Sequence, residues 1–181
     1  MTVMERRRFE RVYADHYDTV LRYCLRRTTR EDALDAAAET FTVAWRRREA
    51  VPWAEPLPWL YGVAHKVLAN QWRSWFRQRR VTARLRAAAG DPDPDSDIQV
   101  LRPAEDERVL KALEALRPED REVIRLVAWE DLSREEVAVA LDCSANAVTK
   151  RLNRALDHLA AVLGTDGRAA HPLFRRERNS A

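Results

Sequence analysis

Cysteine and glycine are scarce in this chain of 181 residues, and the few copies present fit no catalytic or metal-binding pattern. The two cysteines, Cys24 and Cys143, fall on apolar helical positions where buried thiols are expected, and no cysteine or histidine cluster has zinc-ligand spacing. The four glycines form no phosphate-binding loop, and the four histidines are scattered along the chain. We therefore expect no enzyme activity, no metal site and no cofactor.

Long apolar runs are also missing. No run approaches the ~20 residues that are needed to span a bilayer. An early arginine cluster, Arg6 to Arg8, is followed by charged residues where a signal peptide would need its apolar core. We predict a cytoplasmic protein without a membrane partner.

Helical periodicity runs along nearly every ordered segment, whereas strand alternation and internal repeats are absent from the sequence. The first helix is predicted from an apolar stripe at Phe9, Val12, Tyr13, His16, Tyr17, Val20, Leu21 and Cys24. A capping pattern at Thr29 and Asp32 starts a second helix, whose predicted inward positions are Leu34, Ala37, Ala38, Phe41, Ala44 and Trp45. After a proline-rich loop, a third helix is expected from near Pro58. The predicted fold class is all-α.

Two small helical domains joined by a flexible linker are the expected organisation. The acidic run GDPDPDSD at 90–97 cannot bury enough apolar surface to order itself. We place the first domain at 1–80, the acidic linker at 81–103, the second domain at 104–163 and a basic, disordered tail at 164–181. The net charge of +3 is unevenly distributed, since the first domain is basic and the second acidic. This asymmetry suggests separate surfaces for separate partners.

Residues 132–155 have the pattern of a helix-turn-helix, with two short helices around a tight turn. Asp142 lies at the turn, where a residue that tolerates left-handed backbone is needed, and Ser144 is placed to cap the second helix. The second helix carries three basic residues, as expected of a helix that enters the DNA major groove. The alternative is an ordinary helical hairpin with a solvated basic face. The predicted inward positions are Val137, Leu141, Cys143, Val148 and Leu152.

Four motifs, in this order and spacing, resemble the extracytoplasmic-function sigma factors, the small two-domain initiation factors of bacterial RNA polymerase, in an actinobacterial-like form. They are the acidic run from Asp32 to Phe41 with Ala44-Trp45, PWLYGVA at 58–64, LRPEDREV at 116–123 and the helix-turn-helix. The resemblance covers roughly residues 9–80 and 104–163. It implies promoter recognition, DNA opening and transcription initiation rather than bond chemistry, with core RNA polymerase and promoter DNA as partners.

The resemblance also implies a polymerase-docking surface. Asp32, Asp35 and Glu39 would dock on the clamp of the largest polymerase subunit through complementary charge. Without the resemblance, a merely solvated helix face is the simpler interpretation. The second domain would meet the flap of the second-largest subunit. The resemblance further implies a monomer when the protein is free, and an anti-sigma factor as a partner that no residue of the sequence identifies.

A unit that recognises the minus-ten element is implied over residues 50–80. The matching positions are Val51, Trp53, Lys66 and Asn70 for the pocket of a flipped base, and Arg73 and Arg77 for phosphates. Trp72 either stacks on a base or packs into the core. His65, Lys66 and Trp72 depart from the residues that the family often carries, so the base preference cannot be transferred.

The helix-turn-helix matches the unit that recognises the minus-thirty-five element. Thr149, Lys150 and Asn153 match base-reading positions, and asparagine and lysine can bind purine edges. Arg151 and Arg154 match positions that contact phosphates in the family. Arg154 is near enough to the bases to contact either a phosphate or a base. DNA shape also contributes to recognition of this element in the family.

A conventional helix-turn-helix regulator, binding DNA as a dimer without polymerase, is the alternative function. The acidic strip and the unit at 50–80 argue against it. For the acidic linker two interpretations stay open. It is either a flexible tether or a segment that threads the RNA channel of the polymerase and mimics RNA charge.

Overall fold

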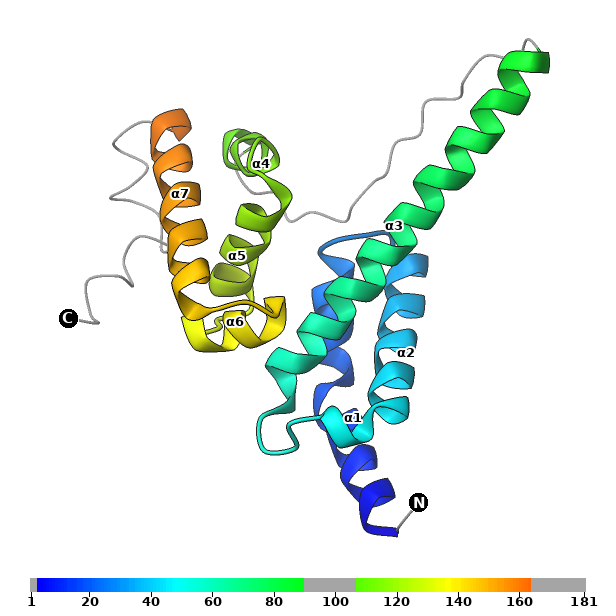
Figure 1. Ribbon diagram of the computed structural model, residues 1–181, viewed down its shortest axis with the longest axis vertical. Coiled ribbons are helices and arrows are strands. Elements are labelled where there is room, and N and C mark those ends of the chain that lie inside the picture. The colour runs from blue at the N-terminus through cyan, green and yellow to red at the C-terminus, as the bar shows by residue number, and fades with distance from the viewer. Residues whose placement is uncertain (1–2, 90–106, 164–181) are drawn as a thin grey trace. The chain divides into compact units, whose positions relative to one another are not determined.

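Figure 1 shows the computed structural model, which describes residues 3–89 and 107–163. Within these ranges the secondary structure consists of α-helices and one short 3-10 helix, without a strand, which confirms the all-α class. The chain divides into two compact units, Met1–Leu101 and Arg102–Ala181. The acidic run at 90–97 and the basic tail at 164–181 lie outside the described residues.

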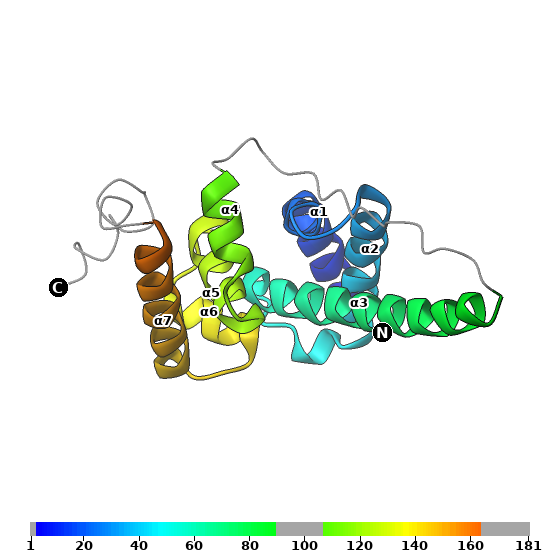
Figure 2. The same ribbon diagram turned by 90° about the horizontal axis from the view of Figure 1, so that it is seen from above.

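The first unit is a bundle of three helices, α1 (Val3–Leu25), α2 (Arg30–Arg46) and α3 (Pro56–Ala89), with the 3-10 helix η1 (Arg48–Ala50) between α2 and α3. Helices α1 and α2 lie side by side and both pack against α3 (Figure 2). Small side chains on α2 permit close packing, and the largest fully buried side chains come from the other two helices. The buried set includes Val20, Tyr23, Cys24, Ala33, Ala36, Ala37, Leu60, Tyr61 and Ala64.

Aromatic contacts join the three helices. The Tyr23 and Tyr61 rings lie 4.9 Å apart between α1 and α3. Between α1 and α2, Phe9 contacts Trp45 at 4.8 Å and Tyr13 contacts Phe41 at 4.9 Å in edge geometry. Such pairs stabilise a fold by about 0.5–1.5 kcal/mol beyond the area that they bury.

Two inward positions predicted on α2 were wrong. Leu34 is 40% exposed, and Ala38 is exposed as well. Thr40 is buried in their place, because its hydroxyl donates to the Ala36 carbonyl oxygen at 2.7 Å and so leaves no unsatisfied polar atom. The buried face of α2 is therefore rotated toward Ala36 and Thr40, which exposes an apolar side chain.

Helix α3 is longer than the sequence pattern indicated. It begins at Pro56 rather than near Pro58, and it continues to Ala89, past residue 80 where we ended the first domain. A proline fits the first turn of a helix because its missing N–H would have no intrahelical partner there.

The second unit holds α4 (Glu107–Glu114), α5 (Pro118–Trp129), α6 (Arg134–Leu141) and α7 (Ala145–Leu163). Helix α7 packs against the other three helices and supplies much of the core. Arg121 on α5 donates to the carbonyl oxygens of Leu113 at 2.9 Å and Leu116 at 3.0 Å. These bonds satisfy one acceptor in the last turn of α4, where carbonyls lack intrahelical partners, and one in the turn that follows.

The turn between α6 and α7 matches its prediction. Asp142 is left-handed, with φ 52° and ψ 51°, and the Ala147 N–H donates to the Ser144 hydroxyl at 3.2 Å. Ser133 and Glu136 form a reciprocal capping box at the start of α6. This box was not among the predicted features, although serine followed by glutamate three residues later is its usual signature.

Candidate nucleic-acid interface

Helix α3 presents one polar and basic stripe to solvent. Lys66, Asn70, Arg73 and Arg77 are all exposed, and their spacing of four, three and four residues puts them on one face of the helix. The Arg73 guanidinium donates to the Asn70 amide oxygen. Four of the six residues predicted for the minus-ten element thus share a continuous surface, which we call the basic stripe.

The loop before α3 carries the other two residues predicted for the minus-ten element, and they are less exposed than the basic stripe. Val51 directly follows η1 and is buried, with 5% of its surface exposed. It therefore offers little surface to a base, and its place in the pocket stays a prediction. Trp53 is half-buried in the same loop and keeps part of its surface accessible.

Three aromatic side chains of α3 contact one another close to the basic stripe. Trp72 lies 6.4 Å from Trp75 and 6.0 Å from Phe76, and the Trp75 and Phe76 rings are 5.0 Å apart. Phe76 is 53% exposed, whereas both tryptophans are half-buried. Trp72 is thus neither fully packed into the core nor fully exposed for stacking on a base. Phe76 was not among the predicted site residues.

The predicted polymerase-docking face of α2 combines charge with an apolar side chain. Asp35 and Glu39 are exposed beside Leu34, and Glu39 lies in a long ion pair of 3.8 Å with Arg46. Asp32 has a local role, because its carboxylate accepts hydrogen bonds from the hydroxyls of the two threonines before α2 at 2.9 and 3.3 Å. The exposed surface available to a partner is therefore centred on Leu34, Asp35 and Glu39, which we call the α2 strip.

Helix α7 is the recognition helix of the helix-turn-helix. Lys150 and Asn153 are exposed, and Val148 and Leu152 are buried on the opposite side. Thr149 is half-buried, and its hydroxyl donates to the Ala145 carbonyl oxygen at 3.0 Å. The two exposed residues are thus the most accessible of those predicted to contact bases.

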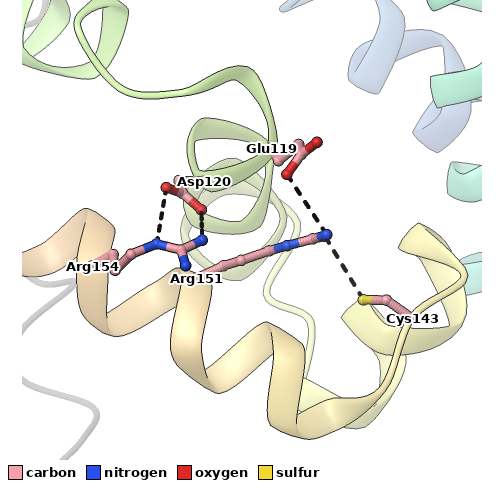
Figure 3. A network of polar contacts seen from close by, with 5 residues as sticks. All are labelled: Glu119, Asp120, Cys143, Arg151 and Arg154. Atoms are coloured by element: carbon pink, nitrogen blue, oxygen red, sulfur yellow. Dashed lines mark hydrogen bonds and ion pairs between the residues drawn. The ribbon is translucent and has the colours of Figure 1, made fainter.

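The two arginines of α7 are joined to the start of α5 (Figure 3). Arg154 Nη2 lies 2.8 Å from Asp120 Oδ1, and Arg154 Nε donates to Asp120 Oδ2 at 3.4 Å. This hydrogen-bonded carboxylate raises the pKa of Arg154 above its ordinary value.

Arg151 makes longer contacts, with Nη2 3.7 Å from Glu119 Oε2 and Nη1 3.9 Å from Cys143 Sγ. Sequence periodicity could not find these partners, because Glu119 belongs to α5 and Cys143 to the turn before α7.

No group of residues in the described ranges could hold a metal ion. Among the same residues, no helix has both the length and the apolar character that crossing a membrane requires.

Comparisons with known proteins agree with this geometry. Residues 106–159 match the family described as sigma-70, region 4, which covers α4 to α7. The sigma factor NccH of Alcaligenes xylosoxydans xylosoxydans is 30% identical over 141 residues, 73% of each chain. The ECF RNA polymerase sigma factor BldN of Streptomyces coelicolor is 28% identical over 163 residues, covering 88% of this chain and 62% of that protein.

A solved structure has the same fold. CnrH, in complex with the cytosolic domain of CnrY, matches with a TM-score of 0.56 and 28% identity, covering 87% of this chain and 88% of that chain. The chain spans less than two thirds of the length of several curated relatives that it matches. From the identity and coverage of these matches, the chain belongs to the RNA polymerase sigma factors, in the extracytoplasmic-function group.

Proposed function

We propose that this protein binds core RNA polymerase and directs it to a specific promoter, where it helps to open the DNA. The observation that carries the proposal is the pair of exposed basic surfaces, the basic stripe of α3 and the exposed face of α7, one in each compact unit. Initiation needs two such surfaces, because one must hold duplex DNA while the other stabilises unpaired bases. No bond chemistry is required of the protein.

The recognition helix α7 would bind the minus-thirty-five element in the major groove. Lys150 and Asn153 are exposed side chains whose donors match purine edges, and each good bidentate contact contributes about 1–3 kcal/mol of discrimination. Thr149 would contribute a contact at the edge of this face, and Arg151 would approach a phosphate.

The basic stripe would follow the strand at the minus-ten element. Lys66 and Asn70 would face a base, and Arg73 and Arg77 would contact phosphates. Flipping a base out of the duplex costs a few kcal/mol, and stacking on an aromatic ring offsets about 1–3 kcal/mol of it. Trp53, an aromatic residue that is half-buried in the loop before α3, is the side chain best suited to this stacking.

The α2 strip would dock on the clamp of the largest polymerase subunit. Exposed carboxylates steer a basic partner and set its register, and Leu34 adds apolar contact area. The second unit would meet the flap of the second-largest subunit. Asp32 would act indirectly, because its carboxylate accepts from the hydroxyl of Thr29, the residue that caps the helix presenting the strip.

An anti-sigma factor is a further proposed partner. Without a partner, the protein would be a monomer. Support comes from the similar fold of CnrH, whose structure contains the cytosolic domain of CnrY. The acidic segment at 90–97 would connect the two units, as a tether or along the RNA channel.

Run-off transcription with purified core RNA polymerase tests the proposal. We expect the protein to start transcripts from a small set of fragments in a genomic DNA pool. Core enzyme alone is the control. If no fragment responds while the isolated protein binds one DNA sequence tightly as a dimer, the protein is a conventional helix-turn-helix regulator instead.

A further inference from the structure

Asp120 is a buried carboxylate on α5 that pairs with Arg154 of the recognition helix. It lies in the first turn of α5, and only 6% of its side chain is exposed. A carboxylate near a helix N-terminus is stabilised by the helix dipole, and here Arg154 adds a charge-assisted pair. The two hydrogen bonds to Arg154 hold the carboxylate in one orientation.

The guanidinium of Arg154 uses only one of its edges for Asp120. Its Nε and Nη2 atoms meet the two carboxylate oxygens, while the edge formed by Nη1 and Nη2 is not needed for that pair. The Arg154 side chain remains 53% exposed. Because the guanidinium is a rigid fork with five N–H donors, fixing one edge also fixes the direction of the other.

Arg154 also shares a face of α7 with the residues proposed to read DNA. It follows Lys150 by four residues, and Asn153 follows Lys150 by three, so all three lie on the same side of the helix. All three are exposed. The second edge of Arg154 therefore belongs to the exposed face of the recognition helix.

We propose that Asp120 is a positioning residue for promoter recognition, which holds Arg154 so that its second edge forms a bidentate contact with two acceptors on duplex DNA. The acceptors are either two phosphate oxygens or O6 and N7 of a guanine. Asp120 strengthens binding by fixing the side chain beforehand, which lowers the ordering cost on association. This inference rests on the proposed function, since it concerns the DNA that α7 would bind.

The test uses the full chain with core polymerase and the strongest promoter fragment recovered from the genomic pool. Asp120→Asn keeps the shape but loses the charge that aligns the fork, and Arg154→Lys keeps the charge but loses the fork. We expect each variant to weaken promoter binding roughly tenfold. The double variant should be no weaker than Arg154→Lys alone, because Asp120 acts through Arg154.

Glu119→Gln is the matched control. It removes the same charge from the neighbouring residue, whose side chain is 70% exposed and whose distance to Arg151 is 3.7 Å. This variant should bind the fragment within about twofold of the wild-type protein, as expected of a weak surface pair.

Two results would overturn the inference. One is wild-type promoter binding by Asp120→Asn. The other is an equal further loss when Asp120→Asn is added to Arg154→Lys, with a lowered unfolding temperature, which would assign Asp120 a purely structural role. Failure of the proposed function looks different, because then the wild-type protein would support no transcript from any fragment.

Modified DNA identifies the acceptors. A guanine contact predicts that 7-deazaguanine at one position weakens binding of the wild-type protein but not of Arg154→Ala, which has no side-chain donor. A phosphate contact predicts the same contrast for a neutral methylphosphonate at one position. If no substitution of either kind distinguishes the two proteins, Arg154 does not contact DNA and the inference fails.

Discussion

Asp142 allows the chain to reverse between α6 and α7. Its left-handed backbone, φ 52° and ψ 51°, lets its N–H bond to carbonyl oxygens at the end of α6 and lets α7 begin three residues later. This conformation costs an ordinary residue roughly 1–2 kcal/mol, less for aspartate and nothing for glycine. The geometry of the helix-turn-helix thus depends on one residue that tolerates a disfavoured backbone.

Replacing Asp142 should change stability according to the cost of a positive φ. We expect Asp142→Gly to raise the free energy of unfolding by up to about 1 kcal/mol, and Asp142→Val to lower it by more than that. Thermal unfolding of the full chain measures both. Asp142→Asn is the control, because asparagine tolerates the same backbone without the charge. A change in Asp142→Asn as large as in the other variants would attribute the effect to charge.

Helix α2 contributes one face to the core of the first unit and the opposite face to the α2 strip. Its buried face carries Ala33, Ala36, Ala37 and Ala44, whereas Leu34, Asp35 and Glu39 are exposed. An exposed leucine beside carboxylates does not stabilise the isolated bundle. It fits a surface that becomes covered when a partner binds.

Reversing one charge on this element should impair assembly while preserving the fold. We expect Asp35→Arg to weaken binding to core RNA polymerase about tenfold or more, because like charges would then meet at the clamp. Co-purification and a titration of run-off activity measure the loss, and circular dichroism checks the helix content. Asp18→Arg makes the same change on an exposed position of α1. Equal losses in the two variants would indicate a general charge effect rather than a docking surface.

The whole molecule consists of two units that each have their own core and their own exposed basic face. In the first unit this face is the basic stripe, and in the second it surrounds Lys150. The two faces belong to different units. Changes in the two faces should therefore combine independently.

This independence can be measured with Lys66→Ala and Lys150→Ala. We expect each single variant to reduce transcription at limiting protein about three- to tenfold, and the double variant to show the product of the two losses. A promoter with a scrambled minus-thirty-five element should respond to Lys66→Ala but no longer to Lys150→Ala. If the double variant were as active as the less active single variant, the two residues would not make separate contacts.

Local sequence patterns predicted much of the fold and part of the candidate site. The all-α class, the helix-turn-helix with its Asp142 turn, and the Ser144 cap depend on residues within a few positions of one another. The basic stripe follows in the same way, since helical periodicity alone puts Lys66, Asn70, Arg73 and Arg77 on one face. Such features are fixed by backbone geometry, so a sequence is enough to locate them.

Packing between helices decided the rest. The pairing of Arg154 with Asp120 joins residues far apart in the chain, and only the arrangement of α5 against α7 brings them together. Burial of Val51 and exposure of Leu34 likewise depend on how the bundle turns each face toward its neighbours. By itself, the sequence determined which residues carry charge and which helices they lie on. Only the tertiary structure decided which charges are held by a partner, because distance between helices is set by packing and not by spacing along the chain.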